Sequence, residues 1–177
     1  MGIMDSLSNF LGQRDGDFVK LDSMSNAFGP GPLLCCYGIP AGIDDEEIQD
    51  MIADGAPSAA SKAKVVRVSD TDDNVMDLSL QEALESMVDG SLATTTTASL
   101  ETSAAALDVP VLFFSGFGNA EMMAVYNILG REIYEETGGR SKSACAKAVP
   151  NAMEKPLRQV LTEIASDHTD AIASSQA

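Results

Sequence analysis

Two apolar runs of the chain each end in a glycine, at Gly38 and Gly116, and such a turn can bring backbone amides close to a phosphate. The surrounding pattern does not fit a nucleotide site. A dinucleotide fingerprint needs a further glycine where Glu121 stands, and neither run is followed by the Gly-Lys-Ser/Thr ending of a P-loop. Glu46, Glu47 and Glu121 also occupy the predicted helix starts where a phosphate would bind. We therefore interpret both glycines as structural turn residues.

His168 is the single histidine of the chain, and it directly follows Asp167. A Ser-His-Asp triad would place its base near the end of the last predicted helix, where a fraying terminus would hold it poorly. A helix C-terminus is, however, a favourable place for a cation. The sequence therefore favours a surface role for His168, and we predict no catalytic residue.

The three cysteines do not form a metal or disulfide pattern. Cys35 and Cys36 are adjacent in a predicted strand, so their side chains should point to opposite faces and cannot bind one metal ion together. Cys145 lies in a second predicted strand with no histidine near it in sequence. We expect all three thiols to pack in the core of a protein from a reducing compartment.

Four aspartates between residues 70 and 77 resemble a cation-binding loop at first sight: Asp70, Asp72, Asp73 and Asp77. The glycine and the terminal glutamate that an EF-hand loop requires are missing from this segment. We interpret it as a solvated acidic loop and predict no metal site and no cofactor.

The elements that position these residues follow from hydrophobic spacing. Strands are predicted at 33–38, 64–69, 111–116 and 143–149, and helices at 44–53, 79–88, 119–137 and from about 151 to 168. Capping boxes are expected at three helix starts, and they pair Asp44 with Glu47, Ser79 with Glu82, and Asn151 with Glu154. Asn119 is the expected N-cap of the remaining helix.

The two halves of the chain show the same pattern. Pro32 and Gly38 correspond to Pro110 and Gly116 at a constant offset of 78 residues, with apolar residues between them in both halves. We therefore predict an α/β fold of two tandem βαβα repeats that form one four-stranded, mostly parallel sheet with helices packed on it. A ferredoxin-like α+β sandwich, with some antiparallel strands, is the alternative.

Composition divides the chain into five parts. These are an irregular segment with one short helix (1–31), the first repeat (32–89), a flexible linker of small polar residues (90–108), the second repeat (109–168) and a disordered tail (169–177). No apolar run is long enough to span a membrane.

The chain is strongly acidic, with 27 acidic against 11 basic side chains and a formal net charge of −16. This field would repel nucleic acid, and no cluster of lysine or arginine offsets it. An acidic protein can instead dock on a basic protein surface. The residues expected to make this contact are Asp44, Asp45, Glu46, Glu47, Asp50 and Asp54.

The second half resembles a known family. The segment Val111–Phe117, the helix that starts at Asn119, the segment Ala146–Asn151 and the helix ending at His168 are similar to the DUF3783 family, a small uncharacterised α/β domain. The resemblance covers residues 109–168. It implies a fold and no particular reaction.

A second resemblance concerns the start of the chain and its Asp-rich and Ser-rich first half. These are similar to plastid proteins of diatoms and related algae, a group that includes a stromal accessory subunit of photosystem I. The resemblance implies a plastid stromal location on the stromal side of the thylakoid, with any membrane association made through the assembly. A cytoplasmic location is the alternative.

Together these observations favour a non-enzymatic interaction protein that docks through its acidic surface on a larger assembly. The alternative is a small-molecule-binding or enzymatic domain with its site at the carboxyl ends of the strands. That alternative site would consist of Gly38, Ile39, Ser115, Gly116 and Asn119.

Overall fold

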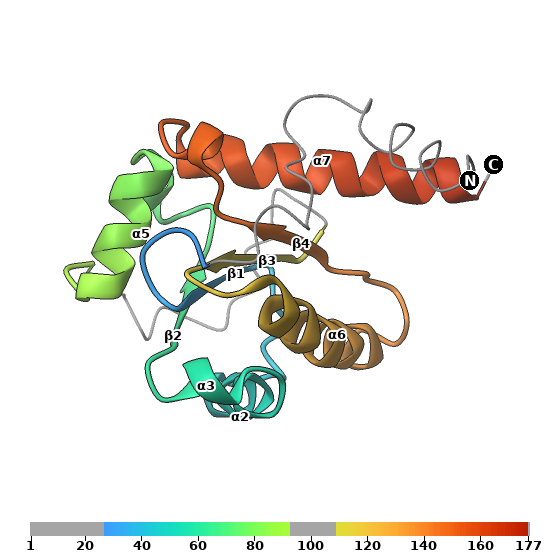
Figure 1. The fold of residues 1–177 in the computed structure, drawn as a ribbon. Coiled ribbons are helices and arrows are strands. Elements are labelled where there is room, and N and C mark those ends of the chain that lie inside the picture. The colour runs from blue at the N-terminus through green and yellow to red at the C-terminus, as the bar shows by residue number, and fades with distance from the viewer. Residues whose placement is uncertain (1–26, 93–108, 177) are drawn as a thin grey trace, which may run out of the picture.

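The computed structural model describes residues 27–92 and 109–176 (Figure 1). Its elements in chain order are β1 (Leu33–Tyr37), α2 (Asp45–Gly55), α3 (Pro57–Ala60), β2 (Lys64–Val68), α4 (Asp73–Met76), α5 (Leu80–Asp89), β3 (Val111–Ser115), α6 (Asn119–Glu136), β4 (Ala144–Lys147), the 3₁₀ turn η2 (Pro150–Ala152) and α7 (Leu157–Ser175). The predicted short helix before residue 12 and most of the predicted linker lie outside the described residues.

The strands form one open mixed sheet in the order β2-β1-β3-β4, which confirms the predicted α/β class. The outer pairs, β1 with β2 and β3 with β4, are parallel, as a βαβ connection requires. The central pair is antiparallel, with Leu33 opposite Ser115 and Tyr37 opposite Val111. The carboxyl ends of β1 and β3 therefore lie at opposite ends of the sheet.

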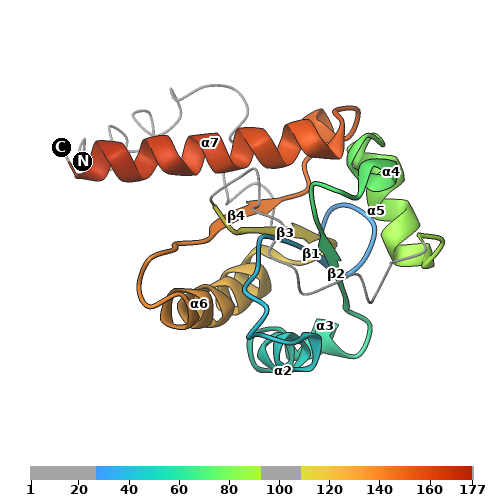
Figure 2. The ribbon, with the colours of Figure 1, turned by 180° about the vertical axis from the view of Figure 1, so that it is seen from behind.

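Helices cover both faces of the sheet (Figures 1 and 2). One layer holds α4, α5 and α7, and its core includes Cys35 and Phe113. The other holds α2, α3 and α6, and its core includes Cys36 and Phe114. Every residue of β1 and β3 is buried, because both strands are central and covered on both sides. This explains why the two strands read as continuous apolar runs.

The two halves make corresponding contacts across the centre of the sheet. Cys35 pairs with Phe113 in the middle of the antiparallel ladder. Farther out, the Leu80 amide donates to the Lys155 carbonyl at 2.8 Å, and the Leu157 amide donates to the Leu78 carbonyl at 2.9 Å. Leu80 and Leu157 are the first residues of α5 and α7. The contacts are thus reciprocal, as in an approximate two-fold arrangement. The internal repeat of the sequence stays a prediction.

Two of the predicted helix caps are confirmed. The Glu47 amide donates to Asp44 at 2.8 Å, and the Asp44 amide donates to the Glu47 carboxylate at 3.0 Å. Ser79 and Glu82 form the same reciprocal pair at the start of α5. Each box satisfies amides that a helix start leaves without intrahelical partners.

The other two predicted caps are wrong, although α6 begins at Asn119 as predicted. Gly118, and not Asn119, is the N-cap of α6. Asn151 lies in η2, and α7 begins only at Leu157, after Pro156. Pro156 forms an isolated bridge with Ser79, so pairing between the two halves sets this start in place of a side-chain cap.

Helix α7 also extends past the predicted end at His168 and continues to Ser175. Residues 169–175, predicted to be part of a disordered tail, are therefore helical. The hydroxyl of Thr169 donates to the Ala165 carbonyl, and that of Ser174 donates to the Asp170 carbonyl. In both bonds a hydroxyl caps a carbonyl of the preceding helical turn. The small polar residues of this segment are thus compatible with a helix, although we expected them to favour disorder.

The turn after β3 gives a test of the close approach between the backbones of Gly116 and Gly31. Gly116 has φ +75°, and a Cβ placed there would lie 3.1 Å from the backbone of Gly31. Gly138 has φ +65° with open space around it. We expect Gly138→Ala to cost about 1 kcal/mol of unfolding free energy for its left-handed backbone, and Gly116→Ala to cost about 1–2 kcal/mol more. Urea unfolding measures both, and equal losses would contradict the close approach.

Candidate functional site

The acidic residues predicted to bind a partner all lie on α2 or its N-cap, and three of them have local roles. Asp44 and Glu47 form the capping box. Asp45 accepts a hydrogen bond from Arg67 Nε of β2 at 2.6 Å, and Arg67 also donates to the Ile43 carbonyl. These three carboxylates therefore fix the start of the helix against the sheet.

The other three, Glu46, Asp50 and Asp54, are exposed. Their spacing of four residues puts them in one row along the outer side of α2. Across the described residues, no ion pair involves this row. The row is therefore open to an approaching partner.

Helix α6 packs beside α2 and adds carboxylates to the same layer. Glu132, Glu135 and Glu136 lie at the end of α6, whose last turn has no basic residue. The Glu136 side chain lies over Gly42, because a Cβ at Gly42 would overlap it. The end of α6 thus reaches the start of α2. We call the row on α2 and these three glutamates the acidic surface.

The five residues of the alternative ligand site do not come together. Gly38 and Ile39 follow β1, whereas Ser115, Gly116 and Asn119 belong to the end of β3 and the start of α6. Because β1 and β3 are antiparallel, the structure places the two groups at opposite ends of the sheet.

Each end of the central strands is also covered by backbone of the other half. The Ser115 hydroxyl donates to the Pro30 carbonyl, and the Gly116 amide donates to the Phe28 carbonyl at 2.8 Å. At the opposite end, a Cβ on Gly38 would lie 3.5 Å from Pro110. Asn119 accepts a hydrogen bond from Lys147 Nζ at 2.7 Å, and burial lowers the pKa of that lysine. These polar groups therefore already serve the fold.

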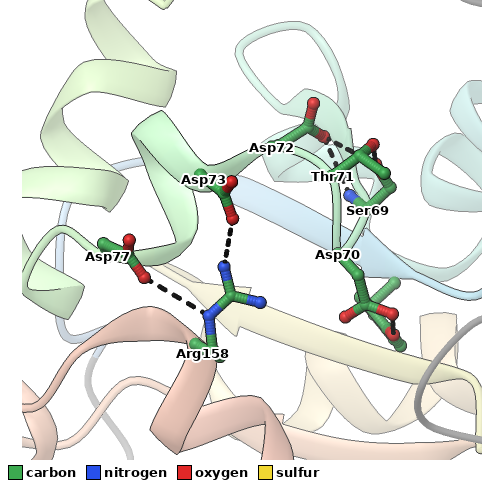
Figure 3. Close-up of polar contacts among 8 residues, drawn as sticks. Ser69, Asp70, Thr71, Asp72, Asp73, Asp77 and Arg158 are labelled. Atoms are coloured by element: carbon green, nitrogen blue, oxygen red, sulfur yellow. Dashed lines mark hydrogen bonds and ion pairs between the residues drawn. The ribbon is translucent and has the colours of Figure 1, made fainter.

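The aspartates of the acidic loop after β2 accept hydrogen bonds from neighbouring residues, as Figure 3 shows. Arg158 of α7 donates to Asp73 at 2.7 Å and to Asp77 at 3.3 Å. Asp72 accepts from the Ser69 amide at 2.9 Å, and Asp70 accepts from the Tyr37 hydroxyl at 2.7 Å. Within the described ranges, no group of three or more His, Cys, Asp or Glu side chains is placed to hold a metal ion.

Burial differs among the three cysteines, and Cys145 of β4 is only partly buried. Cys35 and Cys36 are fully buried in opposite layers of the core, as their adjacency in a strand predicts. Burial raises the pKa of Cys36 and of Cys145 to about 12, and it raises that of Cys35 further. A thiolate nucleophile is therefore disfavoured at all three positions.

Sequence reasoning missed one group of residues that the fold assembles from three elements. Tyr126 of α6, Ser143 just before β4 and His168 of α7 line the same surface groove. They are up to 42 residues apart in the chain, and no motif joins them. The available signal was Ser143 itself, a polar residue at the start of the predicted strand of small residues at 143–149.

The Arg158 contact gives a test of the acidic loop. Arg158→Gln should lower the urea midpoint at low salt, because Asp73 and Asp77 lose their partner, and the loss should shrink in 0.5 M NaCl. In a double-mutant cycle, Asp73→Asn combined with Asp77→Asn should have little further effect in the Arg158→Gln background. Fully additive effects would show that the contact does not stabilise the protein.

The cysteines give a second test. At pH 8 the raised pKa values keep the thiols protonated, so the native protein should react with a disulfide reagent at least 100-fold more slowly than the urea-unfolded chain. Absorbance of the released thiolate measures both rates. A rapid native reaction of one equivalent would contradict the raised pKa of Cys145, the cysteine that is only partly buried.

Comparison of the chain with protein-family models, with curated proteins and with solved structures gives no match. The likeness of residues 109–168 to the DUF3783 family, and that of the first half to algal plastid proteins, stay predictions. None of the helices in the described ranges combines the length and the hydropathy that a membrane span requires.

Proposed function

We propose that this protein is a non-enzymatic docking protein whose acidic surface binds a basic surface of a larger protein assembly. The observation that carries the proposal is the row of Glu46, Asp50 and Asp54 on α2, together with the carboxylates at the end of α6. No reaction is needed to account for these groups.

Charge repulsion along the row opposes the stability of α2, although Glu46 lies in the first turn, where the helix dipole favours a carboxylate. Carboxylates four residues apart repel each other, and here Glu46 faces Asp50 and Asp50 faces Asp54 along the helix. The glutamates at the end of α6 lie at the negative end of a helix dipole. A basic partner would relieve both effects, so the arrangement favours the bound state over the free one.

The mechanism is electrostatic. A surface of one sign steers a partner of the opposite sign and orients it, and it raises the association rate more than the final affinity. Packing of α6 beside α2 keeps the two parts of the acidic surface in one layer.

The first partner to test is photosystem I on the stromal side of the thylakoid. The resemblance of the acidic first half to algal plastid proteins supports this choice, as does the acidic row on α2 of that half. The corresponding location would be the plastid stroma.

The proposal is tested by neutralising the row. We expect Glu46→Gln, Asp50→Asn and Asp54→Asn together to reduce the association rate with isolated photosystem I at least tenfold at 50 mM salt, with little change in melting temperature. Biolayer interferometry gives the rate, and thermal unfolding gives the stability. For the unmodified protein, the rate should fall steeply as salt rises to 300 mM.

A matched control removes three exposed carboxylates of the other layer by Asp89→Asn, Glu154→Gln and Asp170→Asn. This variant has the same net charge as the first but should keep most of the binding. An equal loss of association rate in both variants would show that net charge, and not the acidic surface, determines binding. Unchanged binding in both variants would refute docking through α2. If photosystem I does not bind at all, that partner is rejected.

A further inference from the structure

A surface groove lies beside the start of β4, between α6 and α7. Two hydrogen bonds fix the backbone at its base. The Tyr126 hydroxyl of α6 donates to the Ser143 carbonyl at 3.0 Å, and the His168 Nε2 of α7 lies 3.1 Å from the Lys142 carbonyl. Side chains from both helices thus hold successive carbonyls, so the groove has a fixed base.

The Ser143 hydroxyl at this base has no hydrogen-bond partner. Ser143 is only 2% exposed and lines the groove. Leaving a buried hydroxyl without a partner is unfavourable, because it has lost its hydrogen bonds to water. Such groups are uncommon in proteins, and each one calls for a specific explanation.

The corresponding place in the first half shows that the fold does not require this hydroxyl. Ala63 precedes β2 as Ser143 precedes β4. There the Gln49 side chain of α2 donates to the Ala63 carbonyl at 3.2 Å, as Tyr126 does to the Ser143 carbonyl. The backbone contact is therefore made in both halves, but only the second half has a polar side chain beneath the groove.

The wall formed by α6 carries two tyrosines with a glycine between them. Tyr126, Gly130 and Tyr134 follow at intervals of four residues and so lie on one side of the helix. A Cβ on Gly130 would lie 3.1 Å from the Ser143 Oγ and 3.4 Å from the Tyr126 ring. Tyr134 is 42% exposed, which is unusual for so large a side chain. Ser143 and the Tyr126 ring therefore occupy the space that a side chain at position 130 would need, and the glycine keeps this part of the wall flat.

The charge of the groove is opposite to that of the molecule. Arg131 and Lys142 line it together with His168, and its lining contains no carboxylate. The whole chain has more than twice as many acidic as basic side chains. A local cationic lining in such a protein favours an anionic ligand.

We propose that this groove binds a small aromatic carboxylate. The ring of the ligand lies over Gly130 between Tyr126 and Tyr134, and its carboxylate pairs with Arg131 and Lys142. The Ser143 hydroxyl donates to a carboxylate oxygen once its side chain rotates toward the groove. The site uses no residue of the acidic surface, so it stands independently of the docking proposal.

The test is a titration of the full-length, ¹⁵N-labelled protein with benzoate, followed by amide chemical shifts. Benzamide serves as the neutral analogue and acetate as the analogue without a ring. We expect saturable shifts at Gly130, Ser143 and His168 with benzoate, and at least tenfold weaker binding of either analogue.

Variants separate the groove from general charge effects. Lys142→Gln should weaken benzoate binding at least threefold, whereas the matched control Lys62→Gln, at an exposed lysine of the other half, should leave it unchanged. Ser143→Ala should also weaken binding by about threefold without lowering the melting temperature, because alanine occupies the corresponding place in the first half. Shifts that do not saturate, that lie elsewhere, or that benzamide and acetate reproduce equally would overturn the proposal. Equal losses in the two lysine variants would also overturn it.

Discussion

The structure depends on the antiparallel pairing of β1 with β3. This pairing joins two parallel strand pairs into a single sheet and places the buried residues of both central strands between two helix layers. Its centre is the pair of Cys35 and Phe113. The reciprocal bonds of Leu80 and Leu157 farther out are consistent with the same symmetric arrangement. Without the other half, each strand pair would leave the edge of its central strand, β1 or β3, unpaired.

This pairing also decides where function can lie. Open α/β sheets usually bind ligands where the carboxyl ends of neighbouring strands meet. Here the ends of β1 and β3 point in opposite directions, and each is covered by backbone that precedes a strand of the other half. The available surfaces are then the helix layers and the grooves beside the outer strands. The acidic surface and the groove next to Ser143 occupy these two kinds of place.

Much of the local structure could be predicted from the sequence. The apolar runs that start at Leu33 and Val111 predict strands covered on both faces. The capping boxes that start at Asp44 and Ser79 can be recognised because both residues of each box lie within four positions of the sequence. Asn151 carries a similar signal and misleads, because contacts with the first half fix the start of α7. Local patterns therefore work wherever the deciding partner is close in sequence.

The direction of β3 could not be predicted, because more than 40 residues separate it from the preceding strand and either direction buries the same side chains. The alternative ligand site failed to assemble for that reason. The groove was missed because its residues belong to three elements that meet only in the folded chain. The acidic row on α2, in contrast, needed only the spacing along one helix, so its geometry was accessible from the sequence.

The most direct measurement of the central pairing is a set of nuclear Overhauser effects between backbone protons of β1 and β3 in the full-length protein. The structure predicts cross-peaks that link Cys35 with Phe113, Leu33 with Ser115 and Tyr37 with Val111. Cross-peaks that instead link Leu33 with Val111 and Tyr37 with Ser115 would mean a parallel pair. That result would contradict the arrangement on which the separation of the two strand ends depends.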